Sequence, residues 1–532
     1  MTKNTLGEGT DVSQPMLDEQ LYGVATVASL YERAIRRYAD REAIVSGDTR
    51  YTYRQFGEEI SRYVQMFKSY GLKRGDALAL LSGNRPEVMF VMAACQFMGM
   101  RYTPLHPLGS VEDHVFVLED AEICALVVDG CAYPDQARAL PSLRMVLTFE
   151  ACGFGHDLSE RVAQFRPQPL QIDAVGSDIA QVFYTGGTTG RSKGVAMPHR
   201  MWVNNMKGLA AEREFPLPLR FLMASPISHA GGGNIAPIQL KGGAIVIQPK
   251  FDPLSFLQMV ERERITATIL VPTALYSVLD HPRLKEFDVS SLKLIVYGSA
   301  PIAPTRLEQA MEVFGPIFCQ LYGQTECGSI SYLALADHSL DKAHLLESCG
   351  LPVMGIDVRI LDQDLREVQV GEIGEICVRG PSIMAGYWKR PEETAKVFEG
   401  GWLHTGDLAK RDADGYLYIV GRAKDMIISG GFNVYPKEIE DVIGEHPAVA
   451  LCAVIGVPHP KWGEAVTAFV VAKAGASARP DELIAMVKDR KGAVHAPKTV
   501  YFVESLPLTG YHKVDKVALR KPFWEEQARQ VG

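Results

Sequence analysis

Short apolar runs alternate with helical patterns through the middle of the chain. Residues 77–82 (ALALLS) and 124–129 (CALVVD) are apolar runs of strand length, and Pro86 begins a helical pattern that continues to Gln96. The same alternation recurs further on, with expected helices at 253–264 and 305–314 and expected strands at 267–271 and 292–297. Strands that alternate with helices are typical of parallel sheets covered by helices, so the sequence predicts an α/β fold.

The pattern changes after about residue 355, where short strands and tight turns replace the longer helices. Residues 372–379 and 416–420 read as strands, and Asp414-Gly415 precedes the second as a hairpin signal. Residues 437–443 place three apolar side chains on one helical face. The tail from Arg422 on has a slight excess of Lys and Arg over Asp and Glu, whereas the rest of the chain is acidic. These differences predict a separate C-terminal domain.

Composition excludes several classes of protein. Hydrophobic residues make up 47% and charged residues 22% of the 532 residues, which are ordinary globular values. The net charge of −8 argues against a nucleic-acid binder, because such proteins need a basic face. The 9 cysteines are scattered without a Cys-x-x-Cys pair. That argues against a disulfide scaffold and a structural zinc site, and favours a reducing compartment.

Membrane and targeting signals are not apparent in the sequence. The most apolar long stretch, residues 88–100, contains Gln96 and is shorter than the roughly 20 residues that a membrane span needs. The N-terminal residues lack the apolar core of a secretory signal, and the last three residues are not a peroxisomal address. We therefore expect a cytoplasmic protein with no integral membrane contact.

A loop rich in Gly and Thr is the most informative stretch. Residues 184–195 read Tyr-Thr-Gly-Gly-Thr-Thr-Gly-Arg-Ser-Lys-Gly-Val and follow the apolar run 179–183, which we expect to be a strand. Glycines let the backbone approach a ligand and point N–H groups at an anion, while hydroxyls and Lys193 add donors. The alternative is a flexible surface loop, but the ordered pattern favours a polyphosphate site. A Walker A loop needs Gly directly before Lys, and Ser192 stands there instead.

The loop resembles the signature of the adenylate-forming superfamily, which comprises acyl-CoA synthetases, peptide-synthetase adenylation domains and firefly luciferase. Further motifs of that superfamily occur in the expected order along nearly the whole chain: 298–301 (GSAP), 321–326 (LYGQTE), 402–407 (WLHTGD), 421–425 (GRAKD) and 429–436 (SGGFNVYP). The resemblance implies a large N-terminal AMP-binding domain, residues 1–423, made of parallel-sheet α/β layers and a small β-barrel-like subdomain. It also implies a small mobile α+β C-terminal domain, residues 424–532, with the hinge at Lys424.

The implied reaction joins a carboxylate to ATP, giving an acyl-adenylate and pyrophosphate, and then makes a thioester with CoA. Because both reactants of the first step are anions, catalysis there is mainly charge neutralisation and positioning. Glu326 would hold Mg²⁺, Thr325 would contact the α-phosphate, Tyr322 the adenine, Asp407 the ribose hydroxyls, and Arg422 the ribose or phosphate. The implied nucleotide-binding set is Thr185, Gly186, Gly187, Thr188, Thr189, Gly190, Lys193, Gly298, Ser299, Ala300, Tyr322, Gly323, Asp407 and Arg422.

A lysine near the C-terminus completes the implied catalytic set. Residues 506–516 (LPLTGYHKVDK) resemble the superfamily's catalytic-lysine segment, which places Lys513 as the bridge between carboxylate and phosphate in the adenylation step. The segment departs from the usual pattern, because His512 stands where Gly is common. That departure concerns the loop geometry rather than the role of Lys513.

The remaining implied sites concern the acid and CoA. His229, Asn234 and Gly323 would bind the acid, and Gly430 and Gly431 would flank the pantetheine tunnel. Trp462 either packs near CoA or belongs to the core of the small domain. No acidic residue occurs in 229–240 to pair with an amino acid's ammonium group, and the apolar residues there suit an uncharged acyl group. Fatty, aryl, arylpropenoic and steroid-derived acids all remain open.

An acid–CoA ligase is the leading interpretation, and three alternatives stand beside it. The first is an adenylation enzyme that loads a separate carrier protein, since the chain ends too soon after Lys513 for an attached carrier. The second is a luciferase-like oxygenase, and the third a nucleotide-binding regulatory protein without turnover. The presence of Lys513, Glu326 and Asp407 argues against the third. Expected partners are a carboxylic acid, ATP and CoA, with Mg²⁺ as cofactor and no nucleic acid, and a homodimer stays an open alternative.

Overall fold

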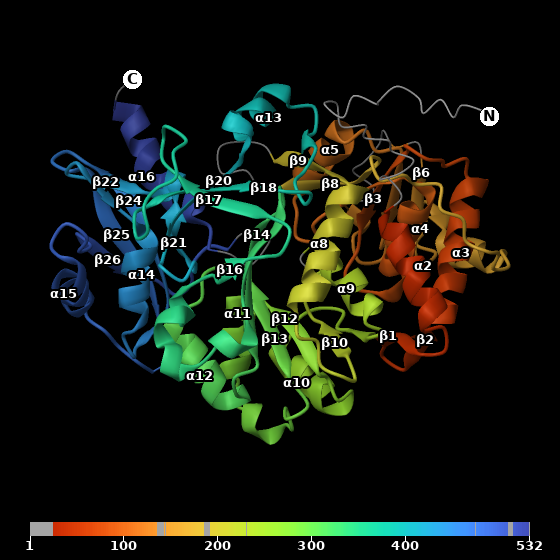
Figure 1. Cartoon of the computed structure of the whole chain (residues 1–532), viewed down its shortest axis with the longest axis horizontal. Helices are drawn as coiled ribbons and strands as arrows, with labels where there is room; N and C mark the ends of the chain where they lie inside the picture. The colour runs from red at the N-terminus through yellow and green to blue at the C-terminus, as the bar shows by residue number, and fades with distance from the viewer. Residues whose placement is uncertain are drawn as a thin grey trace, which may run out of the picture.

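Two large mixed sheets form most of the molecule. The structure is a computed structural model that describes residues 25–135, 143, 145–185, 192–229, 231–473, 475–508 and 514–530, with side chains up to 524 in the last segment. Figure 1 shows the N-terminal third on the right, the green middle of the chain below and at the centre, and the blue C-terminal elements on the left. The sheets are mainly parallel, which confirms the α/β prediction.

The first sheet has eight strands and carries the start of the phosphate-handling loop. Its order is β19 (Gly386–Tyr387), β9 (Lys193–Pro198), β8 (Ile179–Thr185), β4 (Arg101–Pro104), β3 (Ala77–Leu81), β5 (Ala125–Val128), β6 (Met145–Thr148) and β7 (His156–Asp157). From β8 to β7 neighbouring strands are parallel, whereas β8–β9 and β9–β19 are antiparallel. The loop after β8 therefore lies at the same sheet edge as the ends of β3 and β4.

The second sheet has nine strands. Its order is β16 (Leu351–Pro352), β15 (Gly328–Leu333), β14 (Phe318–Gln324), β13 (Leu294–Gly298), β12 (Ala267–Leu270), β10 (Arg220–Met223), β11 (Ala244–Ile247), β1 (Glu42–Ser46) and β2 (Thr49–Thr52). The strands from β14 to β1 are parallel, and antiparallel hairpins flank them at both edges.

Helices fill the space between the two sheets and cover their outer faces. One continuous core joins Leu80 of β3 to Ile245 of β11 through the aromatic side chains Phe56 and Phe90. Burial of such apolar area is the main stabilising term of the fold. The helices of the large domain are α2 (Val27–Arg37), α3 (Tyr53–Ser69), α4 (Pro86–Met98), α5 (Val111–Asp120), α7 (Leu158–Ala163), α8 (His199–Glu212), α9 (Ile235–Leu240), α10 (Pro253–Arg262), α11 (Pro272–Leu279), α12 (Pro304–Phe314) and α13 (Pro391–Val397).

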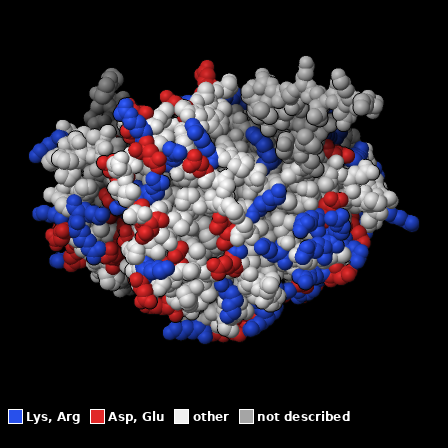
Figure 2. Space-filling model, viewed as in Figure 1, with Lys and Arg blue, Asp and Glu red and all other residues white. Residues whose placement is uncertain are grey.

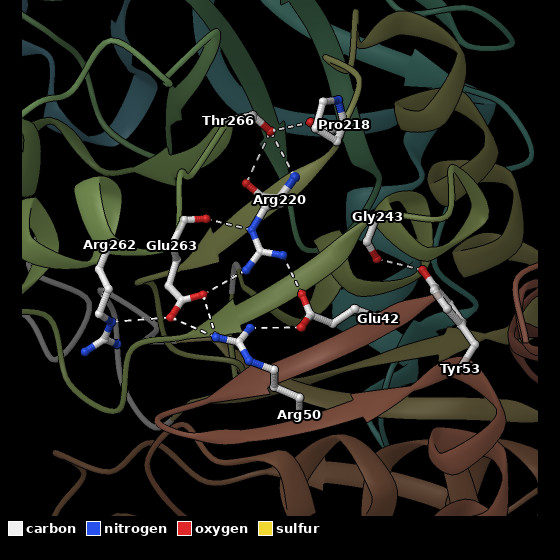
Figure 3. A network of polar contacts seen from close by, with 9 residues as sticks. All are labelled: Glu42, Arg50, Tyr53, Pro218, Arg220, Gly243, Arg262, Glu263 and Thr266. Carbon is white, nitrogen blue, oxygen red and sulfur yellow. Dashed lines mark hydrogen bonds and ion pairs between the residues drawn. The ribbon is translucent and has the colours of Figure 1, made fainter. Parts of the chain in front are cut away.

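An ion-pair network fastens the β1–β2 hairpin to the rest of the second sheet and to the end of α10 (Figure 3). Arg220 of β10 lies between the carboxylates of Glu42 and Glu263, and its Nη2 is 2.8 Å from Glu263 Oε2. Arg50 of β2 also contacts both carboxylates, at 2.9 Å from Glu42 and 3.2 Å from Glu263. Every charge in this network thus has an opposite charge beside it.

A third, antiparallel sheet and a small C-terminal unit complete the chain. The third sheet has the order β17 (Asp357–Leu361), β18 (Gly374–Arg379), β20 (Leu403–Arg411) and β21 (Leu417–Arg422). After the short turn η6 (Ala423–Asp425), the strands β22 (Ile427–Ser429), β23 (Phe432–Val434), β24 (Val449–His459), β25 (Gly463–Ala472) and β26 (Thr499–Phe502) form one sheet with its own apolar core. It is accompanied by α14 (Pro436–Gly444), α15 (Pro480–Lys491) and α16 (Lys516–Gln530).

The elements expected from the sequence are confirmed, with ends that differ by one or two residues. The run 77–82 is β3, the helix at Pro86 is α4, and the hairpin signal Asp414-Gly415 lies in the turn between β20 and β21. On the face shown in Figure 2, Lys and Arg side chains are interspersed with Asp and Glu. Among the described residues, no helix combines the length and the apolar character that crossing a membrane requires.

Candidate active site

The β8–β9 strand pair holds the two ends of the phosphate-handling loop together. Thr185 at the end of β8 pairs with Lys193 at the start of β9. The predicted residues between them, Gly186, Gly187, Thr188, Thr189 and Gly190, lie outside the described residues. The Lys193 Nζ is 2.5 Å from Glu393 Oε2 and 5.2 Å from the ring centroid of Tyr387. A carboxylate and the face of an aromatic ring therefore hold this lysine at the start of β9, where the loop ends.

Close approach of β13, β14 and β15 explains the glycines of two motifs. A Cβ on Gly298 would lie 2.2 Å from the Leu321 carbonyl oxygen, and one on Gly323 would lie 2.1 Å from the Gly328 carbonyl oxygen. Ser299, directly after β13, has φ +67°, which is uncommon for a residue with a side chain. Such outliers cluster at ligand sites, and here it leads into Ala300 at the predicted adenine-binding turn.

Asp407 is the centre of a hydrogen-bond cluster that joins β14, β20 and β21. Its side chain is buried, and Oδ2 accepts hydrogen bonds from the Tyr322 hydroxyl and from Gln324 Nε2, each at 2.6 Å. Its Oδ1 is 2.6 Å from Arg422 Nε, on the neighbouring strand. Burial and the Asp407 charge raise the pKa of Tyr322 well above its usual value. The structure thus brings together Tyr322, Asp407 and Arg422, three of the predicted nucleotide-binding residues.

Glu326 lies in the turn between β14 and β15, directly after Thr325. The Tyr387 hydroxyl donates to Glu326 Oε1 at 3.0 Å, and the Glu326 carbonyl accepts from the Met384 N–H at 2.8 Å. Burial and the Glu326 charge raise the pKa of Tyr387. A half-buried carboxylate held in place by a neutral donor is the ligand type that Mg²⁺ prefers. The residues present therefore fit the predicted metal.

His229 is packed among aromatic rings at the same end of the first sheet. Its ring centroid is 4.5 Å from that of His106, which follows β4, and 5.2 Å from that of Phe183 in β8. The Ser228 Oγ is 2.8 Å from His229 Nδ1. Burial, with a smaller contribution from His106, lowers the pKa of His229 to about 3, so the imidazole is neutral at physiological pH. The third predicted acid-binding residue, Asn234, is buried with its side-chain oxygen on Arg213.

The predicted hinge and CoA residues lie in the small unit and at its junction. Lys424 occupies the turn η6 that follows β21, and the next residue, Asp425, forms an ion pair of 3.1 Å with Arg520 of α16. Gly430 and Gly431 have φ of +60° and +84° and form the turn between β22 and β23. Trp462 is 36% exposed and lies over Gly430, whose Cβ would be 2.9 Å from the ring. Trp462 is therefore a surface residue rather than part of the small core.

Several residues of the site were not predicted from the sequence. Gln324 contacts Asp407 and donates to the Thr405 carbonyl at 2.9 Å. The Tyr387 hydroxyl donates to Glu326, and Glu393 forms an ion pair with Lys193. Gln324 stands inside the quoted 321–326 motif, so its position was a usable signal. Tyr387 and Glu393 carry no local signal, because their role depends on β19 pairing with β9. Lys513 and His512 lie outside the described residues.

Comparison with known proteins places the chain in a family. Residues 31–388 match the AMP-binding enzyme family, and residues 438–513 match the AMP-binding enzyme C-terminal domain. The chain is 46% identical over 518 residues to a medium/long-chain-fatty-acid–CoA ligase of Mycobacterium tuberculosis, covering 94% of this chain and 90% of that protein. It is 35% identical over 496 residues to a feruloyl-CoA synthase of an Amycolatopsis species, covering 92% and 98%.

Solved structures agree with the sequence matches. The amide bond synthetase McbA from Marinactinospora thermotolerans superposes with a TM-score of 0.87 at 33% identity, over 93% of this chain and 99% of that one. The two family matches together span well over half of the sequence, in the order that the motifs predicted. The chain belongs to the AMP-binding enzymes and is an adenylate-forming acyl-CoA synthetase.

Proposed function

We propose that this synthetase activates a carboxylic acid with a largely apolar acyl group and that Asp407 marks the nucleotide end of its site. The acid and ATP give an acyl-adenylate and pyrophosphate, and the CoA thiol then displaces AMP to give acyl-CoA. The observation that carries the proposal is the Asp407 cluster, where Tyr322, Gln324 and Arg422 converge on one buried carboxylate. The buried apolar residues Ile235 and Ile238 follow His229 and support an apolar acyl group.

Asp407 has the capacity to accept ribose hydroxyls. A carboxylate offers about four acceptor positions, and three donors contact this one. Arg422 is the donor that can move, because its side chain is 44% exposed whereas Asp407 is buried. Ribose hydroxyls would use the remaining capacity or replace Arg422, which would then be available to a phosphate. Tyr322 and Gln324 would keep the carboxylate oriented.

Charge around the phosphates would come from this chain and from one metal ion. Lys193 would exchange its contact with Glu393 for a phosphate, and Thr325 would donate to the α-phosphate. Mg²⁺, held by Glu326, would offset the triphosphate charge when bound. Lys513 would bridge the reacting carboxylate and the phosphate during adenylation. Neutral His229, beside the site, would shape the entrance to the acyl pocket without adding charge.

The C-terminal domain, residues 424–532, would change orientation between the two half-reactions about Lys424. The turn η6 is three residues long and follows directly on Arg422, so a small backbone change there moves the whole small domain. In one orientation the segment with Lys513 would reach the phosphates. In the other, Gly430, Gly431 and the exposed ring of Trp462 would flank the pantetheine chain of CoA.

A panel of carboxylic acids tests the proposal directly. Each acid is incubated with ATP, Mg²⁺ and CoA, and pyrophosphate release and thioester mass are measured. Lys513→Ala should abolish pyrophosphate release but largely spare thioester formation from a supplied acyl-adenylate. Lys516→Ala is the matched control, because that lysine lies nearby but pairs with Glu440 at 2.6 Å. Equal loss of both half-reactions in Lys513→Ala would show a structural role.

Glu326→Gln tests the metal site. The variant should require more Mg²⁺ for adenylation and keep its melting temperature, because glutamine can still accept from Tyr387 but carries no charge. An unchanged rate across a magnesium titration would remove Glu326 from the metal site.

The alternative function is the loading of a separate carrier protein. It shares the first half-reaction, so release of pyrophosphate without a CoA thioester would favour it. We also propose the cytoplasm as the location and leave a homodimer open. None of the 9 cysteines, all of which are described, forms a disulfide.

A further inference from the structure

An arginine at the end of α8 is buried without enough hydrogen-bond partners. Arg213 is 3% exposed, and one terminal nitrogen, Nη1, donates to the Asn234 side-chain oxygen. Its Nε and Nη2 have no hydrogen-bond partner within the described part of the chain. Burial lowers the pKa of Arg213, which reflects how poorly this charge is compensated. Buried charges are normally paired, so a guanidinium whose hydrogen-bond partner among the described residues is a neutral amide calls for a further partner.

Arg213 lies further into the domain than the Asp407 cluster. The helix α8 and the strand β15 both run from the neighbourhood of that cluster toward Arg213. Near the turn that carries Thr325 and Glu326, Asn205 Oδ1 accepts from the Ser329 N–H at 3.0 Å. Arg213 is eight helical residues further on, about 12 Å along α8 at a rise of 1.5 Å per residue. It is close enough to Tyr332 to interact with it electrostatically, and Tyr332 is three residues beyond Ser329 in β15, about 10 Å away. The estimates along α8 and along β15 therefore place Arg213 at a similar distance, about 10 to 12 Å, from the contact between Asn205 and Ser329.

A second unpartnered donor lies on the same side of α8. Trp202 and Arg213 are eleven residues apart, which is close to three full turns and places them on one face of the helix. The Trp202 indole N–H is buried and also has no partner among the described residues. The ring of Trp202 would be 3.5 Å from a Cβ on Gly233, next to Asn234. Two unsatisfied donors thus border the segment from His229 to Asn234, where the acid is expected to bind.

We propose that Arg213 binds an acceptor oxygen, of a carboxylate or carbonyl group, at the end of the acyl group remote from the reacting carboxylate. The inference rests on the proposed function, since it takes the 229–240 segment as the wall of the acyl pocket. The chemistry follows from the donors: guanidinium and indole N–H groups donate only, so the complementary ligand must accept. The apolar side chains of Met206 and Leu209 lie between the two donors along α8 and suit the hydrocarbon body of the acid.

Three acids of equal chain length test this assignment. One is a plain alkanoic acid, the second carries a keto group near its far end, and the third is the dicarboxylic acid. The values of kcat/KM come from pyrophosphate release with the full-length enzyme. The wild type should prefer at least one oxygenated acid to the plain acid by about 10-fold or more, because an unpaired buried donor is costly. The keto and dicarboxylic arms then identify which oxygen is bound.

The variant Arg213→Met removes the donors and keeps an apolar side chain of similar length. It should lower kcat/KM for the preferred oxygenated acid by about 10- to 100-fold and leave the plain acid within about twofold. Arg306→Met is the matched control, since Arg306 is also buried but pairs with Asp280 at 2.7 Å on α12. Arg306→Met should leave the preference unchanged.

Two results would overturn the assignment. One is a wild type that shows no preference among the three acids, a comparison that needs no variant to fold. The other is an Arg213→Met enzyme that loses the same factor on all three acids. Absence of pyrophosphate release with every acid would instead contradict the proposed function itself, so the two failures are distinguishable.

Discussion

Two clusters of arginine and carboxylate side chains, both partly buried, differ in how they are closed. In the β1–β2 cluster of Figure 3, Glu263 is buried and contacts Arg50, Arg220 and Arg262, while Arg220 also reaches Glu42. In the Asp407 cluster, one buried carboxylate meets a hydroxyl, an amide and a single, half-exposed arginine. The first cluster is satisfied by its own charges. The second depends on neutral donors and one half-exposed arginine, which leaves acceptor capacity on the carboxylate.

The comparison shows that burial and ion pairing do not by themselves indicate function. Both Glu263 and Asp407 are buried acids with arginine partners. Only the Asp407 cluster joins strands of two different sheets, β14 and β20. An ion pair that spans a single sheet stabilises that sheet, whereas a carboxylate at a junction can also orient a ligand. Substitutions in each cluster should therefore affect different measurements.

The largest expected effect is on catalysis, from Asp407→Asn. Asparagine keeps the size of the side chain but loses the charge and half of its acceptor capacity. Adenylation should slow by about 100-fold or more in kcat/KM, because the proposed ribose contacts and the placement of Arg422 depend on that carboxylate. The rate of pyrophosphate release under limiting ATP measures the effect.

The melting temperature of the same variant provides the control. It should change by only a few degrees, since Tyr322 and Gln324 keep an oxygen acceptor. A large fall in melting temperature together with normal kcat/KM would show that Asp407 stabilises the fold and does not act in catalysis. The two clusters would then have the same role.

The opposite outcome is expected for Glu263→Gln. Removing this charge leaves Arg220 and Arg50 to share Glu42, and the free energy of unfolding should fall by about 2–3 kcal/mol. The value of kcat/KM should stay within about twofold, because the cluster joins β1, β2 and β10 away from Asp407. Urea unfolding monitored by tryptophan fluorescence measures the loss. Asp288→Asn is a control, since its pair with Arg264 is exposed on both sides and should contribute little.

Local patterns predicted the elements but not the contacts that close the site. The apolar run 77–82 suffices for β3, since a buried strand needs only such a run. No run marks β14, because Gln320, Gly323 and Gln324 interrupt it. Two partners of Asp407, Tyr322 and Gln324, lie 85 and 83 positions earlier, and their proximity arises from the packing of two different sheets rather than from sequence spacing. The pairing of Asn234 with Arg213 was likewise outside the reach of any motif.

Lys424→Pro extends the comparison to the turn η6, where Lys424 lies two residues after Arg422 of the Asp407 cluster. Proline fixes φ near −65° and restricts the preceding residue, Ala423, so the turn should lose its ability to change conformation. One half-reaction should fall by about 10-fold or more while the other is kept, and we expect adenylation to be the one that survives. The pyrophosphate burst and the CoA-dependent decay of isolated acyl-adenylate measure the two steps separately.

The matched control is Ser477→Pro, which places the same residue in the exposed loop between β25 and α15 of the small domain. Proportional loss of both half-reactions in Lys424→Pro, or no loss in either, would contradict a hinge at this position.

The smallest expected effect is a change of folding stability with pH, and it concerns His338, which lies outside the Asp407 cluster. His338 is buried, with Nδ1 at 2.8 Å from the Ala334 carbonyl and Nε2 at 3.0 Å from the Tyr297 hydroxyl. The carbonyl requires a proton on Nδ1, so Nε2 accepts from the tyrosine and the ring is neutral. Burial lowers the pKa of His338 to about 4, against about 6.5 in an unfolded chain. Protonation therefore favours the unfolded state.

The sign of the pH effect follows from that depressed pKa. The contribution of His338 to stability is complete above pH 6.5 and is lost as the pH falls from there toward 4. Between pH 7 and pH 5 this loss amounts to about 2 kcal/mol. In His338→Gln, which cannot titrate, the free energy of unfolding should fall by about that much less over the same interval. The exposed His344→Gln should behave like the wild type. An identical pH dependence in His338→Gln and the wild type would mean that protons bind elsewhere, with the buried His199 and the partly buried His229 as the next residues to substitute. Kinetics at pH 5 on enzyme that is still folded should keep the Asp407→Asn defect unchanged, because His338 contacts Tyr297 and Ala334 rather than a member of the Asp407 cluster.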